Sequence, residues 1–126
     1  MTDLTNPKDL IGVNKVSMSQ VPPIAIAHEA CAMLDGTLKY GFRNYREKQV
    51  RASIYVDACL RHLMAWFDGE DKAGDSGIHH LGHARACLGI ILDAEANGTL
   101  VDDRVKGPYA QEVKKLNDWV AERVKR

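Results

Sequence analysis

The stretch ASIYVDACLRHLMAWFDGEDKAGDSGIHHLGHARACLGIILD, residues 52–93, decides the fold. Two segments with helically spaced apolar residues flank a short acidic turn that is rich in glycine. Carboxylates and histidines are concentrated within 27 positions of it: Asp57, Glu70, Asp71 and Asp75, with His62, His79, His80 and His83. Because carboxylate oxygens suit Mg²⁺ or Mn²⁺, with substrate phosphates completing the coordination, we interpret the stretch as a metal-assisted phosphohydrolase site.

Composition narrows the class of protein. A chain of 126 residues with 45% apolar side chains fits one globular domain. The 17 basic residues balance the 17 acidic ones, so no basic field predicts nucleic-acid binding. No apolar run approaches the roughly 18 residues of a membrane span, and no signal peptide is visible. The three cysteines lack CxxC spacing and fit reduced core residues of a cytosolic protein.

Helical spacing recurs along most of the chain. Residues 1–21 show no period and are expected to form an N-terminal arm or loop, followed by a single helical catalytic domain over 22–126. Helices are predicted from Pro22 to Tyr40, from Ser53 to before Gly69, from after Gly77 to Ala96, and from Tyr109 to about Lys125. No strand pattern is visible, so we predict an all-α bundle of about four helices. Residues 42–51 are either a solvated connection or a substrate-contacting loop.

The second predicted helix has an apolar arc and a polar side. At about 100° per residue, Val56, Cys59, Leu60, Leu63 and Phe67 form the arc. The hydroxyl of Ser53 is expected to cap its first N–H groups. Asp57 and Arg61 share a neighbouring face, either as a surface ion pair or as site residues.

The third predicted helix points two histidines inward. Its apolar arc is formed by Leu81, Ala84, Cys87, Leu88, Ile90, Ile91 and Ala94. His80 and His83 lie inside this arc, and burying an unpaired polar ring is costly, so each needs a partner. On the opposite face, Gly82, Ala86 and Gly89 permit close approach of another helix, either of this chain or of a second copy.

The acidic turn, residues 68–77, has a simpler rival explanation. Aspartate, glycine and serine are good turn residues, and Asp75 or Ser76 could serve only as a helix cap. The ligand order and the closing glutamate of an EF-hand are missing, so a calcium loop is not expected.

Longer motifs carry a family resemblance. The segments NPKD, LDGTLKYGFRN, RHLMAWFDGEDKAGDSGIHHLGHA and NGTLVDDR resemble those of the phage and bacterial dATP/dGTP diphosphohydrolases, over about residues 6–104. These include the phage MazZ enzymes and are related to the MazG-like all-α nucleotide pyrophosphatases. The MazG motifs ExxE and ExxD are absent, so ligands cannot be transferred from MazG itself.

The resemblance implies an activity. It implies a homo-oligomeric (dimeric or tetrameric) enzyme that uses Mg²⁺ or Mn²⁺ to cleave a purine deoxynucleoside triphosphate, dGTP or also dATP, into the monophosphate and pyrophosphate. In phages that replace adenine with 2-aminoadenine, such an enzyme supplies the dGMP precursor.

Roles for individual residues follow from matching these motifs and from chemistry. The expected catalytic residues are Asp57, Glu70, Asp71 and His62. The expected metal ligands are Asp57, Glu70, Asp71, Asp75, His80 and His83. The expected nucleotide contacts are Lys8, Lys15, Lys39, Tyr40, Asn44, Arg51 and Arg61.

Two other functions fit parts of the pattern. An HD-type phosphohydrolase would release triphosphate or inorganic phosphate, but no adjacent His-Asp pair occurs. A helical interaction module would use its histidines and acids only for folding, and it predicts neither metal-dependent stabilisation nor nucleotide turnover.

Overall fold

The computed structural model describes residues 6–124 of the chain. The helices are α1 (Pro7–Gly12), α2 (Pro23–Tyr40), α3 (Ala52–Phe67), α4 (His80–Asn97) and α5 (Tyr109–Val124). Two 3₁₀ turns, η1 (Met18–Gln20) and η2 (Asn44–Arg46), and two short strands, β1 (Val50–Arg51) and β2 (Leu100–Val101), complete the list. The prediction of an all-α bundle is confirmed.

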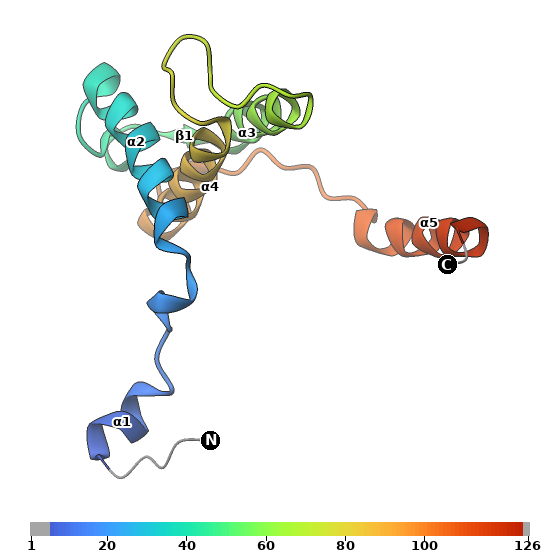
Figure 1. The fold of residues 1–126 in the computed structure, drawn as a ribbon, viewed down its shortest axis with the longest axis horizontal. Helices are drawn as coiled ribbons and strands as arrows, with labels where there is room; N and C mark the ends of the chain where they lie inside the picture. The colour runs from blue at the N-terminus through green and yellow to red at the C-terminus, as the bar shows by residue number, and fades with distance from the viewer. Residues whose placement is uncertain (1–5, 125–126) are drawn as a thin grey trace.

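Helix α4 lies at the centre and packs against both α2 and α3 (Figure 1). Small side chains allow this approach: a Cβ on Gly82 would stand 2.6 Å from the carbonyl oxygen of His28 in α2. A Cβ on Gly89 would stand 2.9 Å from the Glu29 carboxylate. Of the two alternatives for the small-residue face, the contact within this chain is therefore the one observed.

The predicted apolar arcs of α3 and α4 meet different surroundings. On α4 the residues of the arc are buried or half-buried apart from Leu88, and His80 is only 5% exposed. Of the predicted arc on α3 only Cys59 is buried, whereas Val56, Leu60, Leu63 and Phe67 are exposed. The core is consequently thin, and the outer face of α3 is apolar surface.

Two short strands contradict the prediction that the chain has none. β1 and β2 pair in parallel, with Val50 opposite Leu100, and Val50 is only 1% exposed. Two residues per strand are too few to show a period of two, so periodicity could not reveal them. This pairing ties the segment before α3 to the segment after α4.

The cap of α3 also differs from the prediction. The N-cap position is Arg51 and no side chain within the helix caps it. Instead, the Ser53 N–H donates to Asp103 Oδ1 at 2.9 Å and the Ser53 hydroxyl donates to Asp103 Oδ2. A carboxylate 50 residues downstream thus satisfies the helix start, because an acceptor there need not be local.

Helices α1 and α5 project away from the α2–α4 core (Figure 1). The part of the predicted arm that is described, residues 6–21, contains α1 and η1, whereas residues 1–5 lie outside the described part. The last helix matches its prediction up to Val124, and Lys125 lies outside the described part. None of the described helices combines the length and apolar character of a membrane span.

The cysteines are all free thiols, as expected, but they do not share one environment. Cys59 is buried and Cys87 is half-buried, while Cys31 is exposed on α2. The prediction that all three cysteines lie in the core is therefore wrong for Cys31, because Cys31 lies on the side of α2 that faces away from α4.

Candidate functional site

A pocket of about 310 Å³ opens between α2, η2, α3 and α4. The C-terminal half of α2 and the η2 turn contribute Lys39, Tyr40 and Asn44 to its wall. Helix α3 contributes Tyr55 and His62, and further lining comes from Arg43, Tyr45, Asp35, Asp75 and His83. Cationic, aromatic, amide and carboxylate groups therefore face one cavity, as in a binding site for a polar organic ligand.

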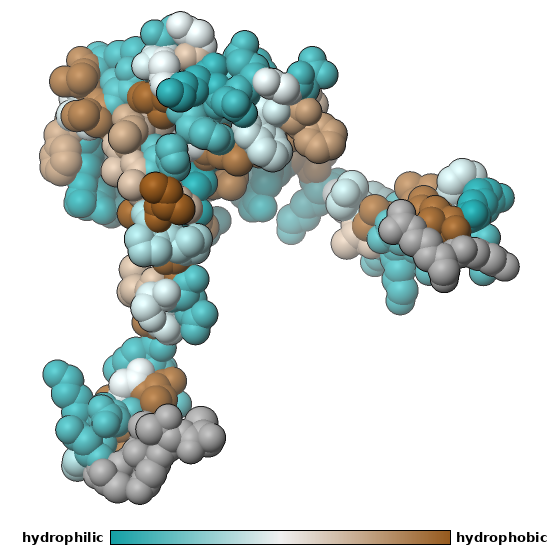
Figure 2. Space-filling model, in the orientation of Figure 1, coloured by the Kyte–Doolittle hydropathy of each residue, from teal (hydrophilic) through white to brown (hydrophobic). Residues whose placement is uncertain are grey.

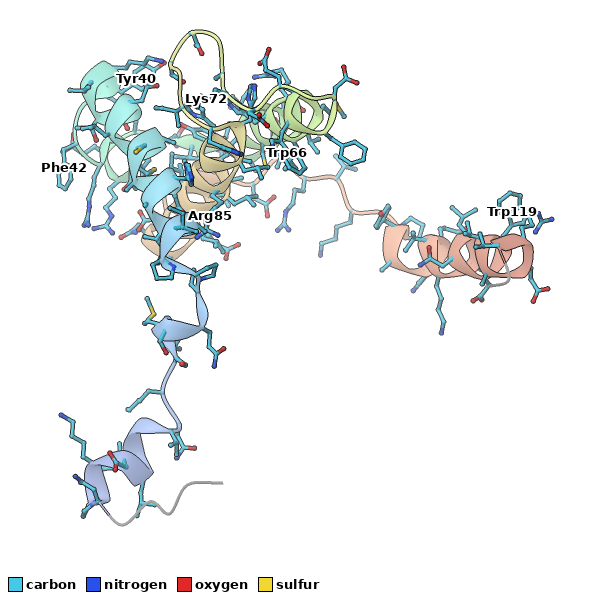
Figure 3. The ribbon with its side chains drawn as sticks, in the orientation of Figure 1. Tyr40, Phe42, Trp66, Lys72, Arg85 and Trp119 are labelled. Carbon is cyan, nitrogen blue, oxygen red and sulfur yellow. The ribbon has the colours of Figure 1, made fainter. Side chains whose placement is uncertain are left out.

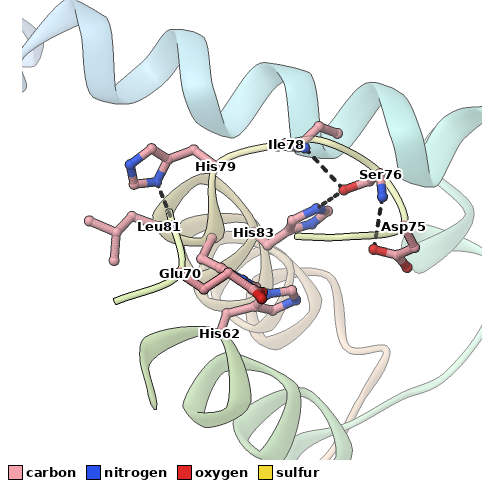
Figure 4. A network of polar contacts seen from close by, with 9 residues as sticks. His62, Glu70, Asp75, Ser76, Ile78, His79, Leu81 and His83 are labelled. Atoms are coloured by element: carbon pink, nitrogen blue, oxygen red, sulfur yellow. Dashed lines mark hydrogen bonds and ion pairs between the residues drawn. The ribbon is translucent and has the colours of Figure 1, made fainter. Parts of the chain in front are cut away.

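A chain of polar contacts runs along one side of this pocket (Figure 4). The Glu70 carboxylate lies 2.6 Å from His80 Nε2, and His80 Nδ1 lies 2.9 Å from His62 Nδ1. The His62 ring stacks on the His83 ring with 4.6 Å between centroids, and His83 Nε2 lies 2.8 Å from Ser76 Oγ. The acidic turn and the two long helices are thereby joined through side chains.

Two of these histidines, His62 and His83, have lowered pKa values and can therefore accept protons. Burial lowers the pKa of His62, and the neighbouring His83 and His80 lower it further. Burial likewise lowers the pKa of His83. Because the usual imidazole pKa is about 6.5, both rings are neutral at pH 7. Since His62 Nδ1 faces His80, its Nε2 is the nitrogen left for a ligand in the pocket.

Opposite charges are fixed at the pocket mouth. Lys39 Nζ lies 3.0 Å from Asp35 Oδ2 one helical turn earlier, and this contact raises the pKa of Lys39. The Ser76 N–H donates to Asp75 Oδ1 at 2.8 Å, which holds the pKa of Asp75 below its ordinary value. The lysine is therefore a cation and Asp75 an anion at neutral pH.

The next feature of the pocket is the set of side chains that could bind a divalent metal ion. Among residues 6–124, no three His, Cys, Asp or Glu side chains form a cluster that could hold a metal. Mg²⁺, however, is commonly bound by one or two carboxylates together with substrate phosphates and water. Asp35 and Asp75 both line the pocket and meet that requirement, so the residues present fit a shared ion rather than a closed protein cage.

Part of the predicted site is brought together at this pocket. Lys39, Tyr40, Asn44, His62, Asp75 and His83 line it. His80 and Glu70 are attached to it through the histidine chain, although the Glu70 side chain is 61% exposed. These eight residues come from α2, η2, α3, the acidic turn and α4, and their proximity is a property of the helix packing.

Other predicted residues lie elsewhere in this chain. Asp57 and Asp71 are exposed, and the backbone carbonyl of Asp71 accepts from the His80 N–H. Arg51 Nη1 lies 3.9 Å from Asp103 Oδ2 rather than at the pocket. Arg61 is exposed, although its charge contributes to the low pKa of His62.

The two lysines of the arm are placed apart from the pocket. Lys8 and Lys15 line a separate open hollow on the arm beside α1. Helix α1 lies beyond the N-terminal end of α2, while the pocket is at the other end of that helix (Figure 1). Their predicted nucleotide contact stays a prediction.

Sequence reasoning missed four residues of the pocket lining and one residue beside it that contacts His83: Asp35, Arg43, Tyr45 and Tyr55 in the lining, and Ser76 beside it. Two of them had a usable signal. Asp35 precedes Lys39 by four positions, and Tyr55 precedes His62 by seven, so each shares a helix face with a predicted residue. Arg43 had none, because it enters the pocket from a left-handed backbone conformation with φ 51°.

The fold and pocket define an all-α protein whose cavity is lined by cationic, aromatic and carboxylate side chains. The family model described as dATP/dGTP diphosphohydrolase, N-terminal, matches residues 5–104 of the chain. The chain belongs to this family and is a hydrolase of nucleotide diphosphate bonds, which sets aside the non-enzymatic interaction module. Comparison with curated proteins and with solved structures gave no match.

Proposed function

We propose that the protein is a metal-dependent pyrophosphohydrolase that converts a purine deoxynucleoside triphosphate, dGTP and also dATP, into the monophosphate and pyrophosphate. One observation carries the proposal. A single pocket unites two cationic side chains, three tyrosines and an asparagine with two neutral histidines, His62 and His83. Phosphates, a purine ring and a reacting water each find chemically suitable partners in that set.

Different residues of the lining bind different parts of the substrate. Lys39 and Arg43 contact the phosphates, because both keep their charge at neutral pH. Tyr40 and Tyr55 present aromatic faces that stack on the base. Asn44 carries one donor and one acceptor, and it reads the purine edge.

Proton transfer falls to His62. Water attacks the α-phosphorus, the bond from that phosphorus to the bridging oxygen breaks, and pyrophosphate leaves with the bond electrons. His62 Nε2 accepts the proton of the attacking water, while His80 and Glu70 hold the ring in place through its Nδ1. Catalysis of this type depends mainly on positioning and charge neutralisation.

A divalent ion fits beside this machinery. Asp35 and Asp75 would hold Mg²⁺ or Mn²⁺ jointly with the substrate phosphates. When bound, the ion would neutralise phosphate charge and make water a better nucleophile. The ligands predicted from the sequence that lie outside this pair, Asp57, Glu70, Asp71, His80 and His83, remain a rival set, which activity measurements on substituted variants test.

The decisive experiment is a panel of deoxynucleoside and ribonucleoside triphosphates incubated with Mn²⁺, Mg²⁺ or EDTA, with products resolved by chromatography. The proposal expects purine deoxynucleoside monophosphate and pyrophosphate, only with metal. Release of triphosphate instead would support the HD-type rival. Turnover that is unchanged in EDTA would refute the metal dependence.

The biological setting follows from the product. Conversion of dGTP to dGMP would serve control of a phage nucleotide pool or supply of the 2-aminoadenine precursor. We propose further that the working enzyme is a homo-oligomer.

A further inference from the structure

Helix α5 lies outside the family match and carries an apolar seam with no cover. Its members are spaced by four, three, four and four positions: Tyr109, Val113, Leu116, Val120 and Val124. Within α5, as far as Val124, every residue except the half-buried Val113 is exposed, and Leu116 is 61% exposed. The brown apolar patch of this helix stands in the open in Figure 2. Figure 3 shows Trp119 projecting from the same helix into open space.

Helix α3 carries a second seam of the same kind. Val56, Leu60, Leu63 and Phe67 are spaced by four, three and four positions, and Phe67 is 87% exposed. At its C-terminal end an open hollow of about 620 Å³ is lined by Leu63, Met64 and Phe67. This seam lies on a different side of α3 from Tyr55 and His62, which face the pocket.

The exposed area is too large for a compact monomer. A protein of 14.0 kDa is expected to expose about 6,700 Å², whereas this chain exposes 10332 Å². The excess is about 3,600 Å² per chain. Obligate homodimers bury about 2,000–5,000 Å² counted over both chains, so covering part of this excess suffices for a stable pair.

We propose that α5 of one chain packs along the outer face of α3 of a second copy, with the reciprocal contact formed by symmetry. Both helices are 16 residues long. Seams with alternating four- and three-residue spacing pack against one another as knobs into holes. A two-fold arrangement covers both seams of both chains at once, which is the usual logic of a closed dimer.

The flanks of the two seams are also compatible. Met64 and Trp66 stand beside the α3 seam, and Trp119 stands beside the α5 seam, so the apolar contact extends past the central row. Residues 102–108, which join β2 to α5, lead α5 away from α3 of its own chain (Figure 1). The second copy is therefore the occupant that this geometry favours over fold-back of α5.

This inference deepens the proposed homo-oligomer, and it can fail separately from the proposed activity. The readout is molecular mass from light scattering after size exclusion, with helix content checked by circular dichroism. The wild-type chain is expected to elute at no less than twice 14.0 kDa at micromolar concentration. The double variant Leu116→Asp/Val120→Asp and the variant Phe67→Asp are each expected to dissociate at least tenfold more readily while staying helical.

Matched controls place the same charge away from the seams. Gln111→Asp lies on the far side of α5, and Ile54→Asp is an exposed apolar position on α3 outside its seam. Both should keep the wild-type mass. A monomeric wild type at 100 μM (an order-of-magnitude choice well above tight dimer affinities), or a double variant with unchanged mass, overturns the proposal. Dissociation by the α5 variant but not by Phe67→Asp overturns the choice of α3 as the partner surface.

Discussion

Helices α4 and α5 differ in burial in the opposite sense to what their amphipathic patterns suggest. Helix α5 separates an apolar seam from a polar side, yet all of its residues except the half-buried Val113 are exposed. Helix α4 mixes histidine, arginine and glycine with its apolar residues, yet it is the most buried helix of the described chain. An apolar face shows that a helix needs a partner, whereas small residues such as Gly82 decide which helix can approach within the chain.

The largest effect on stability is expected where Gly82 of α4 approaches α2. Gly82→Val should destabilise the fold by about 2–3 kcal/mol, because its Cβ would collide with the His28 carbonyl of α2. Thermal unfolding measures the change. Gly36→Ala is the control, since nothing lies within 4 Å of its Cβ, and it should stabilise α2 by about 0.5–1 kcal/mol. A Gly82→Val protein as stable as wild type would mean that α4 does not pack on α2 in this way.

The second prediction compares a carboxylate of the pocket, Asp75, with a carboxylate on the outer side of α3, Asp57. Asp75→Asn should lower kcat/KM for dGTP by about 100-fold, because it removes one of the two pocket carboxylates that are proposed to hold the divalent ion. Asp57→Asn should leave turnover nearly unchanged, since Asp57 is exposed and does not line the pocket. Steady-state kinetics with Mn²⁺ compare the two. The reverse ranking would uphold the sequence-based role of Asp57 and place the reaction outside this pocket.

Acid should weaken the histidine-lined region before the rest. The pKa values of His62 and His83 are lowered on folding, so the unfolded chain binds protons more readily than the native one below the ordinary pKa. The stability that the two neutral rings contribute is therefore complete above about pH 6.5 and is lost as the pH falls through the folded-state pKa values. The midpoint temperature of thermal unfolding should be lower at pH 5.5 than at pH 7.5. The His62→Gln variant should show a smaller difference between the two pH values. A midpoint that rises on acidification contradicts this sign.

The smallest effect is expected where the core joins the outlying helix. Asp103→Ala should lower the thermal midpoint by a few degrees, because it removes both acceptors at the start of α3. Asp102→Ala is the matched control, since Asp102 pairs with the nearby Arg104 and not with α3. Equal midpoints for the two variants would show that the Asp103 cap contributes nothing to stability.

The sequence by itself determined where the four long helices lie, but not the short α1, which falls in the predicted arm or loop. The prolines before α2, the glycine after α4 and the recurrence of apolar residues are local signals, so the four long helices could be located from them. Histidines inside an apolar arc predicted that His80 is buried and that His83 points inward, and both are observed. The motifs also identified the family, which the match over residues 5–104 confirms.

Only the tertiary structure decided which of these side chains meet. The proximity of Lys39, His62 and His83 depends on how α2, α3 and α4 cross, and crossing is set by packing between residues distant in sequence. The two-residue strands and the Asp103 cap are likewise long-range contacts with no local pattern. The motifs predict a site role for Asp57 together with the other acids, but its position around the α3 axis leaves it exposed and outside the pocket lining.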